Sequence, residues 1–290
     1  MAHHNASNDA DKWDIRITAK QKYFELNLAE LWRYRDLLTM FVKKDIVTIY
    51  KQTILGPIWF VMQPILTSLV FMVVFSRVAK LPTGNVPPVL FYLGSLTLFN
   101  YFSETFRVTS KTFSENATVF GKVYFPRLVL PMAKVISGVV KLMIQFVLFF
   151  IVWGIYLIKG SNMHPNWHMI FFPAVILLLS LMCFGFGIFV TSFTTKYRDL
   201  NFLIAFGVQL WMYITPVLYP LTIVSKEKQI WFWLNPLTSV IEAFKYGFFG
   251  QRGGVWSYSW LLYSTVFTLI MLFVGIIAFN KVEKKFIDTV

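Results

Sequence analysis

Charged side chains are absent from six long stretches of the chain and gather in the segments between them. The stretches cover residues 52–76, 81–103, 142–158, 160–195, 200–225 and 253–280. A helix needs about 20 apolar residues to cross the hydrocarbon core of a bilayer, and the third stretch reaches that length if its helix begins near Pro131. The pattern predicts an all-α integral membrane protein with six transmembrane helices. Composition agrees, because 57% of the residues are hydrophobic and 14% charged, against about 25% charged in soluble domains.

The segment before the first predicted span combines an apolar stripe at helical spacing with interspersed cations. Asn27 and Glu30 have the spacing of a helix capping box. We expect residues 28–51 to form an amphipathic helix in the membrane interface, although packing on a protein partner is an alternative. The cations expected near lipid headgroups are Arg33, Arg35, Lys43 and Lys44. We therefore divide the chain into a cytoplasmic N-terminal arm with an interface helix, residues 1–55, and a six-span domain, residues 56–290.

The segment between the fifth and sixth predicted spans has a different pattern. Residues 225–254 are rich in apolar side chains, but Pro236 interrupts them and each half is too short to span a bilayer. We predict two short re-entrant helices that dip into the outer leaflet and are sheltered by the neighbouring spans. The alternative is an extracellular loop with an interfacial belt of aromatic side chains.

The basic residues indicate how the chain is oriented. Its net charge of +13 is distributed around the spans and not gathered in one patch, so we expect no nucleic-acid partner. With the N-terminus in the cytoplasm, residues 1–51, 104–141, 196–199 and the tail after 280 together hold 20 Lys and Arg, against 7 on the other side. Short-loop Lys and Arg favour the cytoplasmic side, so both termini are expected there.

Several kinds of catalytic chemistry are missing from the sequence. It has no glycine-rich phosphate loop, and Gly121-Lys122 stands alone. Its histidines and single cysteine form no recognisable metal site. Ion-driven carriers usually keep ionisable groups at mid-membrane depth, but the predicted spans contain no carboxylate pair there. The His or Asp/Glu constellation that an acyl- or glycosyltransferase needs at the membrane face is also missing. We expect a transport subunit that is not itself an enzyme and draws its energy from a partner chain.

Several motifs together resemble one family of membrane proteins. They are the Leu31–Leu38 segment LWRYRDLL, Lys44-Asp45, the Tyr50–Trp59 segment YKQTILGPIW, Gln63-Pro64, Phe125-Pro126-Arg127, Leu130-Pro131, Tyr197-Arg198-Asp199 and Asn235-Pro236. From about residue 28 to its end the chain is similar to type 2 ABC export permeases of the polysaccharide and polyol-phosphate class. Those proteins export O-antigens, capsules and teichoic acids.

The resemblance implies an assembly and a location. We expect a homodimer in the cytoplasmic (inner) membrane of a bacterium, together with two copies of a separate ABC ATP-binding subunit. That partner would bind ATP and Mg, and this chain would hold no cofactor. The substrate implied is a lipid-linked, O-antigen-like polysaccharide; a teichoic acid, another lipid or a drug is the alternative. By resemblance residues 114–122 form the coupling helix that docks on the ATPase, with Ser114, Glu115, Asn116, Phe120 and Lys122 as its candidate contacts.

The resemblance also implies a channel lined largely by aromatic side chains, and the chain has 31 Phe, 13 Tyr and 10 Trp. A sliding polymer needs many weak wall contacts, and aromatic faces stack on sugar rings without fixing one register. The candidates on the first and fifth spans are Trp59, Phe60, Phe71, Phe206, Trp211, Tyr213 and Tyr219. The alternative for each ring is contact with lipid or with a neighbouring helix.

Overall fold

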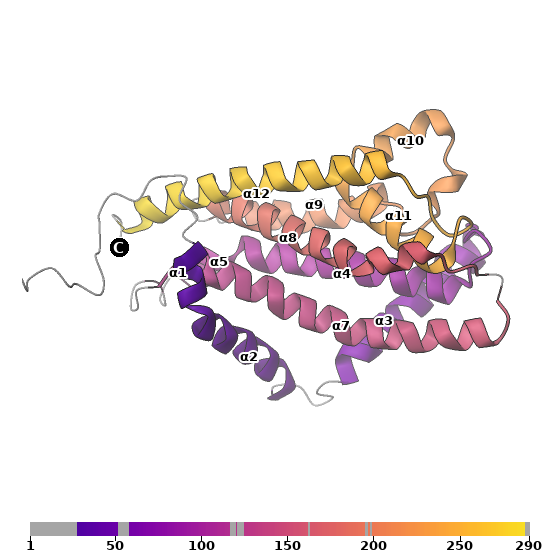
Figure 1. Ribbon diagram of the computed structural model, residues 1–290, viewed down its shortest axis with the longest axis horizontal. Coiled ribbons are helices and arrows are strands. Elements are labelled where there is room, and N and C mark those ends of the chain that lie inside the picture. Colours follow the sequence, from indigo (N-terminus) through magenta and orange to yellow (C-terminus); the bar gives the residue numbers. More distant parts are fainter. Residues whose placement is uncertain are drawn as a thin grey trace, which may run out of the picture.

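The computed structural model describes residues 28–51, 58–116, 120, 125–161, 163–194, 197 and 199–287. Within these ranges the regular elements are all helical, which confirms the predicted class (Figure 1). They are α1 (Leu28–Arg33), α2 (Arg35–Lys51), α3 (Ile58–Phe71), the π-helical η1 (Met72–Val78), α4 (Pro88–Ser110), α5 (Thr112–Glu115), α7 (Val129–Ile158), the 3-10 helix η2 (Trp167–Phe171), α8 (Phe172–Thr194), α9 (Leu200–Ile214), the 3-10 helix η3 (Leu221–Ile223), α10 (Lys226–Trp233), α11 (Pro236–Phe249) and α12 (Tyr258–Ile287).

Four helical segments in the described ranges are long and apolar enough to cross a membrane. They are Ile58–Val78, Val129–Ile158, Trp167–Thr194 and Tyr258–Val282. These segments correspond to the first, third, fourth and sixth predicted spans. The second and fifth predicted spans fall on α4 and α9, and their crossing of the membrane stays a prediction.

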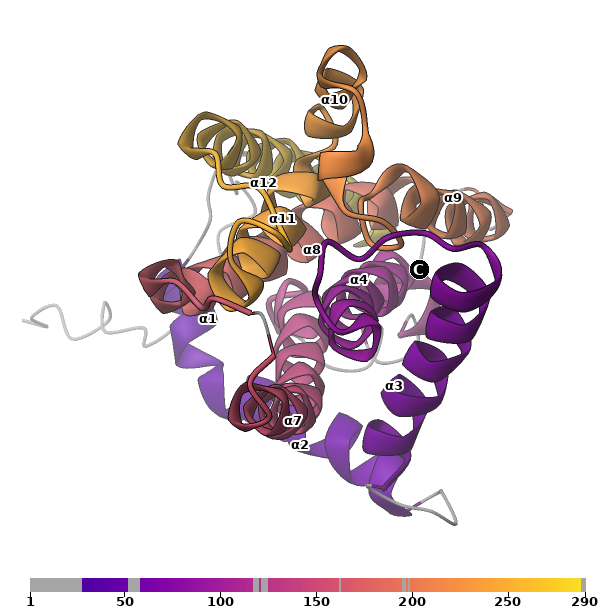
Figure 2. The same ribbon diagram turned by 90° about the vertical axis from the view of Figure 1, so that its right-hand side faces the viewer.

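The central position of α4 explains its modest hydropathy. It lies in the middle of the bundle, among α3, α7, α8, α9 and α11 (Figure 2). Leu90, Phe91 and Phe102 on this helix are fully buried. Since most of α4 is buried in protein, it tolerates hydroxyl side chains such as Thr97, whose Oγ1 donates to the carbonyl of Leu93 at 2.6 Å. By contrast α9 is apolar but has 15 residues, about 22 Å of helix against a hydrocarbon core of about 30 Å.

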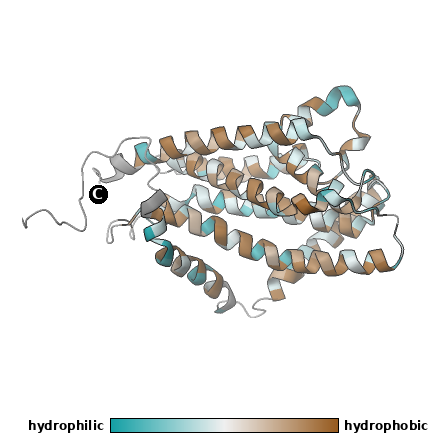
Figure 3. Ribbon diagram, in the orientation of Figure 1, coloured by the Kyte–Doolittle hydropathy of each residue, from teal (hydrophilic) through white to brown (hydrophobic). Residues whose placement is uncertain are grey.

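Apolar side chains also cover the outside of the long helices. On α12 they are exposed at helical spacing, at Leu262, Val266, Leu269, Ile270 and Phe273. Figure 3 shows hydrophobic residues along the long helices and hydrophilic ones on α2 and α10. Contiguous apolar surface of this extent is a feature of proteins that face lipid or a partner.

Glycines bring α8 and α12 into close contact. A Cβ atom on Gly275 would lie 2.7 Å from the carbonyl oxygen of Gly185. A Cβ atom on Gly185 would lie 3.0 Å from the backbone nitrogen of Leu272. Small residues at such crossings let the backbones of membrane helices approach closely.

The predicted N-terminal helix is present, but it is divided at Tyr34 into α1 and α2. Helix α2 crosses the bundle obliquely and packs on α7 (Figure 1). Its Leu37, Leu38 and Phe41 are half-buried against the protein, whereas Met40 is exposed. One face therefore packs on the chain itself, and contact of the other face with the membrane surface stays a prediction.

Residues 225–254 form two short helices, as predicted, with a break at Asn235-Pro236. The Asn235 Oδ1 accepts a hydrogen bond from the backbone N–H of Leu237 at 3.1 Å, and Pro236 occupies the first helical position of α11. At Gly250 the backbone turns to a φ of 78°, and α11 ends. Most of α11 is buried against α4, α8 and α12, while α10 is largely exposed. Insertion of the pair into the outer leaflet stays a prediction.

Candidate functional site

A cluster of aromatic rings joins three parts of the chain at one end of the bundle. Phe113 of α5 stacks on Phe279 of α12 with ring centroids 4.6 Å apart. Phe120 stacks on Phe125 at 5.6 Å, and Phe125 lies 6.0 Å from Phe41 of α2. We call these five rings the aromatic cluster. It connects the predicted coupling segment to the last helix and to the predicted interface helix.

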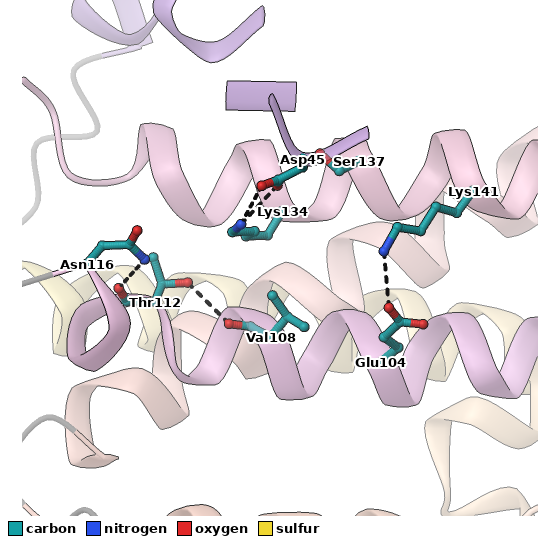
Figure 4. Close-up of polar contacts among 8 residues, drawn as sticks. All are labelled: Asp45, Glu104, Val108, Thr112, Asn116, Lys134, Ser137 and Lys141. Carbon is teal, nitrogen blue, oxygen red and sulfur yellow. Dashed lines mark hydrogen bonds and ion pairs between the residues drawn. The ribbon is translucent and has the colours of Figure 1, made fainter. Parts of the chain in front are cut away.

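The predicted coupling residues divide between this cluster and the surface. Ser114 and Glu115 are exposed at the tip of α5, next to the aromatic cluster. The Asn116 Nδ2 donates to the carbonyl of Thr112 at 2.9 Å and closes the short helix (Figure 4). Phe120 is buried, and Lys122 lies outside the described residues. Among the described coupling candidates, Ser114 and Glu115 are therefore the most open to a docking protein.

A cavity of about 620 Å³ opens between α2, α3, α4 and α7. We call it the polar cavity, because most of the residues that line it have polar side chains. Its charged residues are Lys44, Asp45, Glu104, Lys134 and Lys141. Sequence analysis singled out Lys44 and Asp45 but did not foresee that these five residues share one wall.

Two ion pairs cross the polar cavity (Figure 4). The Lys134 Nζ donates to both carboxylate oxygens of Asp45, at 2.7 and 2.9 Å, and Ser137 Oγ donates to the same carboxylate at 3.3 Å. These contacts fasten α2 to α7. The Lys141 Nζ makes a single contact of 3.1 Å with Glu104 Oε1 of α4, and 55% of the Glu104 side chain is exposed. The second pair is therefore the looser one.

The seven channel candidates do not form one surface within the described residues. Trp59 and Phe60 line the polar cavity, where the first turn of α3 meets α2, α4 and α7. Phe71 is half-buried near the other end of α3, against Phe75. Phe206 and Tyr213 are exposed on the outer face of α9. Whether these residues contact a transported molecule stays a prediction.

Trp211 and Tyr219 make packing contacts at the far end of the bundle. The Trp211 ring packs edge-on against Phe102 at 5.2 Å, and its Nε1 donates to the Asn235 side chain at 2.9 Å. The Tyr219 hydroxyl donates to the carbonyl of Tyr213 at 2.9 Å.

The four predicted headgroup cations are all exposed on α1 and α2. Arg35 lies over the ring of Trp32, 5.6 Å from its centroid, and its Nε is 3.9 Å from Asp36. Arg33 and Lys43 point away from the packed face, and Lys44 reaches the polar cavity. Lys44 therefore lines the polar cavity and is also exposed on the surface of α2.

A buried ion pair was missed by sequence reasoning. Glu242 and Lys245 of α11 contact each other with no exposed side-chain surface. Their neighbours come from outside α11, since the Val255 N–H donates to Glu242 Oε2 at 2.8 Å and Lys245 Nζ donates to the Pro216 carbonyl at 2.9 Å. The signal available was an opposite-charge pair at i and i+3 within an otherwise apolar helix. The pair holds together the connections on both sides of α10 and α11.

Neither the polar cavity nor the buried ion pair has the ligands that a metal site needs. Over the described part of the chain, no group of three or more His, Cys, Asp or Glu residues is close enough to share a metal ion. The polar cavity instead presents ammonium groups, carboxamides and rings, which suit a polar organic ligand.

Comparisons with known proteins agree with this organisation. A family model described as ABC-2 type transporter matches residues 36–249. The O-antigen export system permease protein RfbA of Myxococcus xanthus is 27% identical over 225 residues, which are 77% of this chain and 84% of that protein. A protein of the same name from Klebsiella pneumoniae is 25% identical over 276 residues, 94% of this chain and 99% of its own length. The resemblance inferred from the motifs is confirmed, and the chain belongs to the ABC-2 type transporter family.

Proposed function

We propose that the chain is the membrane-spanning permease subunit of an ATP-driven exporter that moves a lipid-linked, O-antigen-like polysaccharide across the cytoplasmic membrane. The observation that carries the proposal is the similarity to O-antigen export permeases over nearly the whole of both chains. Aromatic side chains and the polar cavity on the helical bundle suit a substrate made of sugar and phosphate.

The assembly that we propose has two copies of this chain and two copies of a separate ATP-binding subunit. The exposed tip of α5 would contact the ATPase, and the aromatic cluster beneath it would carry motion to α12 and α2. With six spans, of which α4 and α9 are the second and fifth, both termini lie on one side, and the distribution of Lys and Arg favours the cytoplasm. In this orientation the polar cavity opens in the cytoplasmic half of the membrane, and α10 and α11 lie at the outer side.

Deletion of the gene in its source bacterium tests the proposed cargo. The expected result is loss of the surface polysaccharide and accumulation of the lipid-linked polymer inside the cell, both reversed by the wild-type gene. Immunoblotting of intact and lysed cells measures the two pools. An unchanged surface polymer, together with a lost teichoic acid or a gained drug sensitivity, would assign the permease to a different cargo.

A further inference from the structure

The walls of the polar cavity are built from polar stripes on facing helices. On α7 the residues Lys134, Lys141 and Gln145 follow one another at helical spacing on the cavity side. On α4, Glu104 and Asn100 do the same. Polar residues in a membrane helix are costly, and they usually face a water-filled cavity or a ligand pathway. Two such stripes facing one space indicate a binding site and not a packing defect.

The charges of the polar cavity favour an anion. Three lysines and two carboxylates line it, so one positive charge is left over. Asp45 is committed to Lys134 and Ser137 through three hydrogen bonds. The single bond between Lys141 and the half-exposed Glu104 is easily replaced, because exposed ion pairs contribute about 1 kcal/mol or less. Lys141 and the exposed Lys44 are therefore the cations that an incoming phosphate can engage.

The polar cavity becomes less charged along α7. Gln145 lies eleven residues beyond Lys134, about 16 Å along the helix axis. At this end the cavity presents three carboxamides, from Gln63, Asn100 and Gln145. Within the described residues none of the three makes a side-chain hydrogen bond. Gln63 and Asn100 are exposed and Gln145 is half-buried, so their donors and acceptors are open to a ligand, and sugar hydroxyls match them.

We propose that the polar cavity binds the phosphate and the first sugar of a lipid-linked saccharide. Lys44 and Lys141 contact the phosphate, the carboxamides contact the sugar hydroxyls, and Trp59 offers a partly exposed ring for stacking. The inference rests on the proposed function, since it assigns a part of the transported molecule to one place on the chain. A phospholipid also carries a phosphate, but it has no sugar for the carboxamides to bind.

Binding to the purified full-length chain in phosphatidylcholine nanodiscs tests the proposal. The probe is a radiolabelled polyprenyl pyrophosphate that carries one sugar. Lys141→Gln should weaken its binding about tenfold, the size expected for one lost charge-assisted hydrogen bond. Glu104→Gln should strengthen binding several-fold, because it releases Lys141, and no misfolded variant gains affinity in this way. Lys159→Gln, at the far end of α7, is the matched control and should bind as the wild type does.

Two further arms identify the ligand. Gln145→Leu should weaken binding of the sugar-bearing probe but not of polyprenyl pyrophosphate without a sugar. Phosphatidylglycerol at the same mole fraction should not displace the probe. Equal displacement would make the cavity a site for bulk lipid and overturn the proposal, as would wild-type affinity in Lys141→Gln. Unchanged binding and normal export in a Lys141→Gln strain would count against the cavity alone. Absence of polysaccharide export by the wild-type chain would count against the permease assignment.

Discussion

At the scale of single residues, the buried pair of Glu242 and Lys245 shapes the end of the molecule that carries α10 and α11. The Lys245 Nζ also lies over the ring of Phe91 on α4, 4.9 Å from its centroid. The pair therefore touches the central helix and both connections that flank α10 and α11. Breaking a buried ion pair by removing one partner strands the other charge in a medium that solvates it poorly.

Removing one member of this pair should destabilise the chain more than removing both. Lys245→Met alone should cost about 3–5 kcal/mol, because the Glu242 carboxylate is left without its cation. The double variant Glu242→Gln with Lys245→Met should recover a large part of that loss. Thermal unfolding of the detergent-purified chain, followed by tryptophan fluorescence, measures both. Glu227→Gln on exposed α10 is the control, and a single variant as stable as the wild type would refute the structural role of the pair.

At the scale of elements, the close contact of α8 with α12 depends on Gly185 and Gly275. We therefore expect alanine to affect the stability of the chain differently at this contact and at an open glycine. Gly275→Ala should lower the thermal stability, by about 1–3 kcal/mol as for other overpacked sites, because its methyl group meets the α8 backbone. Gly154→Ala on α7 has no atom within 4 Å of the new methyl group, and alanine favours helix by up to about 1 kcal/mol. That variant should be neutral or more stable. Equal effects of the two substitutions would contradict the packing of α8 on α12.

The short helix α5 yields a second prediction at this scale, based on exposure. Glu115→Arg changes an exposed residue, so it should weaken association with the ATPase and leave thermal stability unchanged. Phe120→Asp places a charge in the aromatic cluster, so it should destabilise the purified chain itself. Copurification of the ATPase and the melting temperature of the chain separate the two effects. Full ATPase association in the Glu115→Arg variant would remove α5 from the docking surface.

Helix positions were predictable from the sequence because an apolar run of about 20 residues without charge is typical of membrane spans. Helix α12 begins within its charge-free stretch, whereas α4 and α7 extend past theirs and include charged residues such as Glu104 and Lys134. The division of the channel candidates was not predictable. An aromatic ring such as Trp211 can face lipid, a channel or another ring such as Phe102, and the sequence does not distinguish these surroundings. The polar cavity had a readable signal, the spacing of Lys134, Lys141 and Gln145, but the facing helices could not be paired without the fold.

At the scale of the whole molecule, the bundle has one end with α5 and another with α10 and α11 (Figure 1). We predict that the α5 end faces the cytoplasm. Single cysteines, introduced after the buried Cys183 is replaced by alanine, allow labelling of spheroplasts with an impermeant thiol reagent. A cysteine at the exposed position 228 should react from outside, and one at position 115 should react after lysis alone. Labelling of position 115 from outside would show that the predicted orientation is wrong.

The most direct test of the permease assignment is transport by purified components. Proteoliposomes should contain this chain, the ATP-binding subunit that copurifies with it, and radiolabelled lipid-linked polysaccharide. We predict that the polymer crosses the bilayer with ATP and stays in place without it, as measured by its access to an added glycosidase. The chain alone should hydrolyse no ATP. Crossing at the same rate without ATP, or no crossing with active ATPase present, would contradict the assignment.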